Sequence, residues 1–117
     1  MSWPARRNID IYVGDKYTHI IQRQDANGNA VALSDTVQYR AQIRAKATDE
    51  SPLVSFTVTL DREAGTITLD LTSAQTRTLA NYVNFGAVWD VEEYELDNEP
   101  FTSIAGDVRL KHDVSRA

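Results

Sequence analysis

The chain has 117 residues, a formal net charge of −5 and no cysteine. This length suits one domain with a core of its own, and the lack of thiols excludes a disulfide framework, a thiolate zinc site and a cysteine nucleophile. Twelve basic residues against 17 acidic ones, with no long run of either sign, argue against a nucleic-acid-binding surface. Neither a signal-peptide core nor a stretch of membrane-spanning length is present, so we expect a protein made in the cytoplasm without membrane contact.

Short alternating strands fill the first half of the chain. A strand is predicted over residues 8–13, and another over residues 17–24 that carries apolar side chains on both faces. The clearest strand covers residues 37–44. The face that we expect this strand to bury carries Val37, Tyr39, Ala41 and Ile43.

The segment between the second and third strands contains Asn27 and Gly28. This pair is typical of a type I′ hairpin turn, in which both residues have positive φ. The alternative is a calcium loop, because Asp25, Asn27 and Asn29 have the spacing of the first ligands. Such a loop needs a glycine at its sixth position and a glutamate at its twelfth, where this chain has Thr36. We therefore favour the turn.

The middle of the chain predicts one strand over residues 53–60 and another over residues 66–71, joined by a loop in which Gly65 takes positive φ. The inward residues of the later strand are Ile67, Leu69 and Leu71.

A short helix is predicted near residues 73–80. Thr72 or Ser73 can cap it, and Gln75 lies three positions after Thr72, which is the spacing of a capping box. Leu79 and Ala74 are expected to close one end of the core.

Two further strands complete the pattern, over residues 83–93 and 101–110, with a turn over residues 96–100. In the earlier strand the shared inward face carries Phe85, Ala87, Trp89 and Val91. About seven short antiparallel strands with regular turns predict an all-β sandwich, divided into an N-terminal arm (1–7), the sandwich (8–111) and a C-terminal tail (112–117). The expected core anchors are Trp89, Phe56 and Tyr39.

Four acidic residues lie close together in the sequence, namely Asp90, Glu92, Glu93 and Glu95. Asp90 and Glu92 point to one side of a strand, about 7 Å apart, which is a separation compatible with glycoside hydrolysis. An alternating solvent-exposed face explains them more simply, so we expect no catalytic residues and no enzyme activity.

The two histidines, His19 and His112, are far apart in the sequence. A metal at His19 would need Asp10 or Asp15 as further ligands. We favour a surface or rim histidine, and expect no metal and no cofactor.

Arg40 and Arg44 form a polar stripe with Gln38 and Gln42 on the outer face of the third strand. They can pair with Asp90 or Glu92 on a neighbouring strand, or with a neighbouring subunit. We favour the intramolecular ladder and keep both arginines as interface candidates.

Trp3 and Pro4 are the other interface candidates. A tryptophan on a short exposed arm is a typical interface anchor, although the side chain can equally fold back onto its own domain.

The order of segments resembles a family of bacteriophage and prophage tail, baseplate and fibre-region proteins with an immunoglobulin-like β-sandwich. The matching segments are GD (14–15), DANG (25–28), RAQIR (40–44), GTITLDLT (65–72), AQT (74–76), WDVE (89–92), GDVRL (106–110) and VSR (114–116). These segments are distributed over nearly the whole chain after about residue 8.

This resemblance implies a non-enzymatic structural protein of the virion, located in the tail, baseplate or neck or associated with the capsid. Its partners would be other phage structural proteins and further copies of itself, with no small-molecule substrate. The alternative is a carbohydrate-binding or host-adhesion module, for which Tyr12, Tyr82 and Tyr94 are the candidate aromatic residues.

Overall fold

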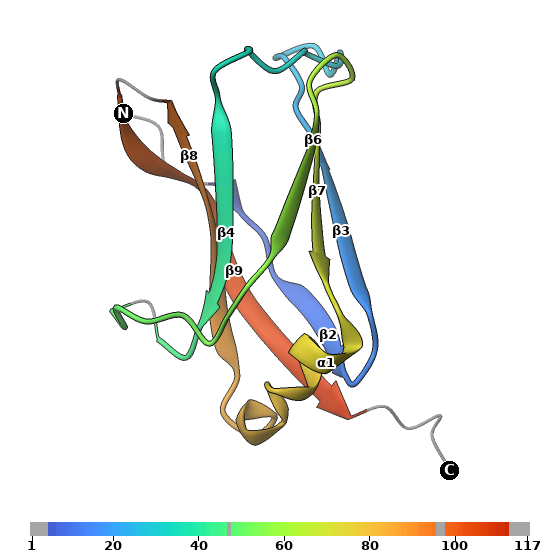
Figure 1. Ribbon diagram of the computed structural model, residues 1–117, viewed down its shortest axis with the longest axis vertical. Helices are drawn as coiled ribbons and strands as arrows, with labels where there is room; N and C mark the ends of the chain where they lie inside the picture. The colour runs from blue at the N-terminus through green and yellow to red at the C-terminus, as the bar shows by residue number, and fades with distance from the viewer. Residues whose placement is uncertain (1–4, 47, 96–97, 113–117) are drawn as a thin grey trace.

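The computed structural model describes residues 5–46, 48–95 and 98–112, which form two β-sheets with little helix (Figure 1). The first sheet has the order β1-β9-β8-β4-β5, with β2 also paired to β9, and the second has the order β3-β7-β6. The first sheet comprises β1 (Ala5–Arg6), β2 (Ile9–Val13), β4 (Gln38–Arg44), β5 (Val54–Ser55), β8 (Ala87–Glu95) and β9 (Asn98–His112). The second comprises β3 (Tyr17–Gln22), β6 (Thr57–Asp61) and β7 (Thr66–Leu71). The prediction of an all-β fold is therefore confirmed.

The prediction that all strands are antiparallel is wrong for the first two. Both β1 and β2 run parallel to β9, with Ala5 opposite Ile104 and Ile9 opposite Val108. A tight hairpin forces antiparallel pairing, but a parallel pair requires a long connection. Nearly the whole chain separates β2 from β9, so no local turn determines their relative direction.

The strand predicted over residues 53–60 is divided between the two sheets. Its first part, β5, pairs with β4, whereas β6 pairs with β7. Phe56 lies at the crossing, 6% exposed, and its ring packs 6.2 Å from the ring of Trp89. The chain thus changes sheets where a large aromatic side chain enters the core.

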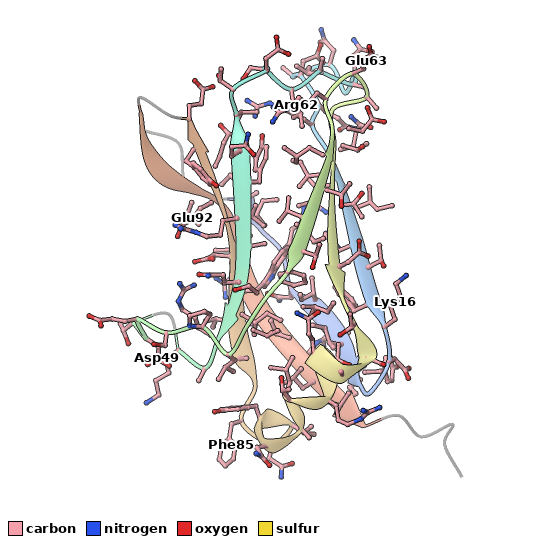
Figure 2. The ribbon with its side chains drawn as sticks, in the orientation of Figure 1. Lys16, Asp49, Arg62, Glu63, Phe85 and Glu92 are labelled. Atoms are coloured by element: carbon pink, nitrogen blue, oxygen red, sulfur yellow. The ribbon has the colours of Figure 1, made fainter. Side chains whose placement is uncertain are left out.

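The buried face of each long strand is the one that alternation predicts. The inward residues of β4, β7 and β8 are buried, and Trp89, Phe56 and Tyr39 all belong to the core. Phe85 is the exception, because it precedes β8 and is 84% exposed, pointing away from the body of the molecule (Figure 2). The strand begins only after Gly86, whose φ of 73° ends the preceding turn.

The turn at Asn27–Gly28 forms, but not as type I′. Within the described residues only glycines have positive φ, so Gly28 (φ 85°) takes this conformation and Asn27 does not. The Gly28 N–H donates to the Asp25 carbonyl (3.0 Å), and the Asp25 carboxylate accepts from the backbone N–H groups of Asn27 and Asn29. The Asp25 side chain therefore organises a turn that ends in a left-handed glycine.

The predicted capping box is present at the start of α1 (Ser73–Arg77). The Thr72 hydroxyl accepts from the Gln75 N–H, and the Gln75 side chain accepts from the Thr72 N–H. The helix is shorter than predicted and is followed by a 3₁₀ turn, η1 (Ala80–Tyr82). Leu79 closes the core as expected, whereas Ala74 is exposed and Thr76 is the buried residue of the helix.

Candidate functional site

The arginine stripe on the outer face of β4 pairs with acids on β8, as the sequence predicts. Arg40 lies directly opposite Glu92 and forms an ion pair with it at 2.5 Å. Its guanidinium carbon also lies 5.9 Å from the centre of the Tyr94 ring. Figure 2 shows Glu92 on this outer side of the first sheet. Arg40 is thus engaged within its own chain, and its role at an interface stays a prediction.

Arg44 is the more constrained of the two arginines. It lies 3.5 Å from the Asp90 carboxylate and donates to the Gln42 side chain (2.5 Å) and the Asp49 carbonyl (3.0 Å). Burial raises the pKa of the Asp90 carboxyl, because the loss of solvation outweighs the opposing effect of Arg44. Arg44 therefore has two structural roles: it pairs with Asp90 on the neighbouring strand, and it holds the loop that follows β4.

A shallow depression of about 380 Å³ lies beside this ladder, over β8 and β9. Arg44 and Asp90 border it, together with Arg6 and Asp107, which form an exposed ion pair at 3.3 Å. The depression is therefore bordered by two pairs of opposite charge.

The four neighbouring acids of β8 divide between the two faces of the sheet. Asp90 and Glu92 share the outer face, as predicted, and each has an arginine partner. Glu93 lies on the opposite face, and Glu95 accepts a hydrogen bond from the Ser34 hydroxyl (3.4 Å). In this arrangement the carboxylates of Asp90 and Glu92 form ion pairs between strands, and that of Glu95 binds the segment before β4.

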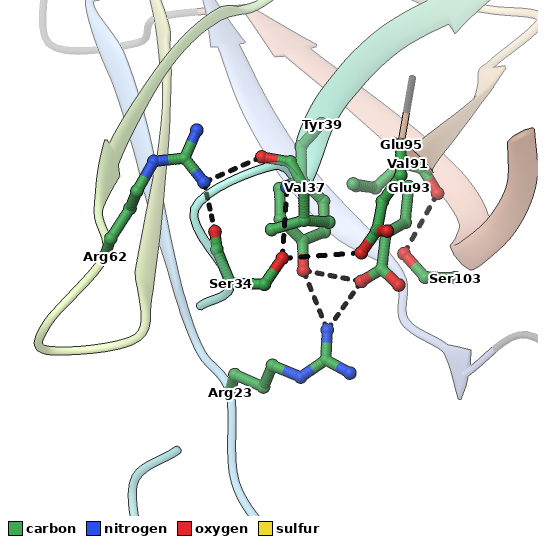
Figure 3. Close-up of polar contacts among 9 residues, drawn as sticks. All are labelled: Arg23, Ser34, Val37, Tyr39, Arg62, Val91, Glu93, Glu95 and Ser103. Atoms are coloured by element: carbon green, nitrogen blue, oxygen red, sulfur yellow. Dashed lines mark hydrogen bonds and ion pairs between the residues drawn. The ribbon is translucent and has the colours of Figure 1, made fainter. Parts of the chain in front are cut away.

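Sequence reasoning did not identify a polar cluster that joins the two sheets (Figure 3). The Tyr39 hydroxyl donates to the Glu93 carboxylate (2.5 Å), and Arg23 donates to both Tyr39 (2.9 Å) and Glu93 (2.6 Å). Arg23 follows β3 of the second sheet, whereas Tyr39 and Glu93 belong to the first. The alternation of β8 did indicate one member of the cluster, because Glu93 lies on the same inward face as Trp89 and Val91.

Arg62 makes a second connection at the same end of the molecule (Figure 3). From the loop after β6 it donates to the carbonyl groups of Ser34 (2.5 Å) and Val37 (2.9 Å). Every buried side-chain nitrogen or oxygen in the described part of the chain has a hydrogen-bond partner. Burying polar groups is costly unless they are paired, so these contacts stabilise the open end between the sheets.

The histidine residues lie apart from these clusters. His19 is half-buried, with its ring stacked on Tyr17 and its edge toward Trp89, and burial lowers its pKa, with Arg7 adding to the effect. Asp10, one of its two suggested co-ligands, binds Arg109 instead (2.7 Å). Among the residues that the structure describes, no group of three or more His, Asp or Glu side chains is arranged to hold a metal. His112 ends β9.

Trp3 and Pro4 lie outside the described residues. The part of the predicted arm that is described belongs to the sheet, because Ala5 and Arg6 form β1 and the Arg7 carbonyl accepts from the Trp89 indole N–H (2.8 Å). In the described part of the chain, no helix has the length and apolar character needed to cross a lipid bilayer.

Neither a protein-family model nor a curated protein matches this chain. A function for it therefore rests on its own residues, on their order in the sequence and on the geometry described above.

Proposed function

We propose that this chain is a non-enzymatic structural subunit of a bacteriophage particle, located in the tail, baseplate or neck or associated with the capsid. It would act through contacts with other particle proteins and with further copies of itself, without a cofactor or substrate. The order of sequence motifs carries this proposal, and the order of strands in the two sheets supports the fold that the resemblance implies.

We also propose that the two sheets form an immunoglobulin-like sandwich. In that fold one sheet contains strands B, E and D, and the facing sheet contains C, F and G. The order β3-β7-β6 corresponds to B-E-D, and the order β4-β8-β9 corresponds to C-F-G. The constant-type arrangement places the first strand beside B, whereas here β2 pairs with the last strand, β9. The family of particle proteins that the sequence resembles implies the same fold.

The surface provides features suited to contacts between subunits. The strands β3 and β6 are the two edges of the second sheet, and edge strands are ready sites for pairing with another chain. Ile20 and Phe85 expose 63% and 84% of their surface. Large exposed apolar side chains are common in contact surfaces.

The proposal is tested by the protein composition of purified particles. We expect peptides of this chain in density-purified particles of the phage or prophage that encodes it, measured by mass spectrometry alongside the major capsid protein. Recovery of the chain only in the soluble fraction of the lysate would contradict a structural role. A catalytically active free enzyme would give that second result.

The carbohydrate-binding alternative requires a group of exposed aromatic residues. Its three candidates lie on separate elements, with Tyr12 on β2, Tyr82 on η1 and Tyr94 near the end of β8. Tyr94 already lies beneath Arg40, and Tyr82 packs against the core. Glycan-array binding by the isolated domain, without self-association in light scattering, would favour this alternative over the structural role.

The hypothesis that Trp3 docks on a neighbouring subunit is tested better by a point substitution than by deletion of the arm, residues 1–7. Such a deletion would also remove β1 and the Arg7 carbonyl that binds Trp89, and would therefore destabilise the domain itself. We expect Trp3→Ala to leave the melting temperature unchanged and to weaken association by about tenfold or more, since buried aromatic anchors dominate interfaces. Unchanged association of Trp3→Ala in sedimentation experiments would contradict a docking arm.

A further inference from the structure

The edge formed by β3 differs from the other edges of the two sheets. Within the described residues β3 (Tyr17–Gln22) pairs only with β7, so one side of its backbone has no strand beside it. An unpaired row of N–H and C=O groups can accept a strand from another chain, and natural proteins usually protect such edges with charged residues, proline or very short strands.

The other edges carry this protection, and β3 does not. Two of them, β1 and β5, are only two residues long, β6 ends at Asp61, and β2 contains Asp10. In contrast, β3 has six residues without a charged side chain or proline other than the half-buried His19. At its middle Ile20 points outward and is 63% exposed.

The surface next to β3 is also hollowed. A depression of about 210 Å³ is lined by residues of β3 and its surroundings, namely Arg7, His19, Ile20, Ile21, Gln22 and Gln24. The depression therefore borders four of the six residues of β3.

The sequence of β3 is complementary to itself in one antiparallel register. With a two-fold axis at Ile20, this residue faces Ile20 of the second copy, and Thr18 faces Gln22 of the second copy. Beyond the strand, Lys16 faces Gln24, so no two like charges are opposed over residues 16–24. The pairing covers two exposed isoleucines and joins hydrogen-bonding side chains at both ends, and both kinds of cross-strand pair are stabilising.

We propose that β3 is the edge at which a second copy of this chain adds, antiparallel, so that the β6-β7-β3 sheets of two copies become one continuous sheet. This inference rests on the proposed function in that it names the surface for contacts between copies. The arrangement has two-fold symmetry, which is the commonest symmetry of soluble oligomers, and its interface is isologous.

The first test places a charge at the centre of the edge. We expect Ile20→Lys to raise the dissociation constant of the dimer by about tenfold or more in sedimentation equilibrium, because two like charges would meet at the axis. Thr59→Lys is the matched control, because Thr59 lies in the same row of the sheet, across Thr68, on the exposed opposite edge. Both variants should melt within a few degrees of the wild type, and equal dimerisation of the two would overturn the assignment to β3.

The second test determines the register of the pairing by disulfide cross-linking. Because the chain contains no cysteine, each variant has a single thiol. Residues facing each other on antiparallel strands have Cα atoms about 4.5 to 5.5 Å apart, within the range of a disulfide. We therefore expect Ile20→Cys to form a covalent dimer on mild oxidation. Thr18→Cys should cross-link much more slowly, because four residues separate it from its own copy, about 14 Å along the strand. Equal cross-linking of the two variants would overturn this register.

The outcomes separate this inference from the proposed function. A wild-type chain that stays monomeric at all concentrations, yet is found in particles, overturns the pairing and leaves the structural role intact. Dimers that cross-link through Ile20→Cys, together with absence from particles, support the pairing and contradict the role. Incorporation into particles that is lost in Ile20→Lys while the wild type is monomeric would assign the edge to a different particle protein and overturn self-pairing.

Discussion

Replacement of Gly106 by alanine should lower the free energy of unfolding by about 3 kcal/mol. A Cβ atom at this position would lie 1.7 Å from the Arg7 carbonyl oxygen and 2.5 Å from its carbon, both of which are backbone atoms. The segment between β1 and β2 packs against β9 here, since both strands pair with the same edge of β9. Urea unfolding of Gly106→Ala, compared with the wild type at neutral pH, measures the effect.

The cost is large because the segment between β1 and β2 is held at several points. Arg7 donates to the Ala105 carbonyl (3.0 Å) and accepts from the Trp89 indole (2.8 Å), while the Asn8 side chain accepts from the Asp107 N–H (3.0 Å). Displacement of Arg7 by more than an ångström would weaken all three hydrogen bonds. It would also separate β1 from β9.

Gly28→Ala is the matched control for this prediction. Gly28 has a φ of 85°, but a methyl group added to its Cα would have no atom within 4 Å, so only the left-handed backbone opposes the substitution. That conformation costs about 1 to 2 kcal/mol for an alanine. A Gly106→Ala variant that is as stable as Gly28→Ala, or more stable, would show that the backbone at Arg7 shifts without loss of stability.

Local patterns predict the parts of this fold that depend on near neighbours in the sequence. Alternation identified the inward faces of β4 and β7, because each strand buries one side and the period of a strand is two. The capping box at Thr72 was predictable for the same reason, since both of its hydrogen bonds join residues three positions apart. The ion pairs of Arg40 and Arg44 were predictable once two alternating strands were assumed to be neighbours.

The parts that were not predicted depend on contacts between distant residues. No local signal indicates that β2 lies parallel to β9, or that the chain changes sheets at Phe56. The polar cluster illustrates the same limit, because Arg23 lies in a connecting segment and reaches Glu93, 70 residues away. The position of Glu93 on the inward face was visible from alternation, but its partner depends on how the two sheets are placed.

The polar cluster makes the stability of the domain sensitive to high pH. Burial raises the pKa of the Tyr39 hydroxyl to about 12, and its hydrogen bond to the negatively charged Glu93 adds to the effect. In the unfolded chain the same group ionises near its ordinary pKa of about 10. The folded state therefore retains a proton that the unfolded state loses.

The stabilisation from Tyr39 is consequently complete below pH 10 and is lost as the pH rises from about 10 to 12. Two pKa units correspond to a loss on the order of 2 kcal/mol in the free energy of unfolding. Burial raises the pKa of Tyr17 as well, so the wild type should lose further stability in the alkaline range. Comparison of variants isolates the contribution of Tyr39.

Tyr39→Phe should be less stable than the wild type by about 1 kcal/mol at pH 8, because Arg23 and Glu93 each lose a hydrogen bond. Between pH 10 and 12 it should lose less stability than the wild type, so that the two curves of unfolding free energy against pH approach each other. Glu93→Gln keeps the buried tyrosine but removes the charge, and should give an intermediate slope. Parallel curves for Tyr39→Phe and the wild type over this range would show that Tyr39 ionises equally in the folded and unfolded chains.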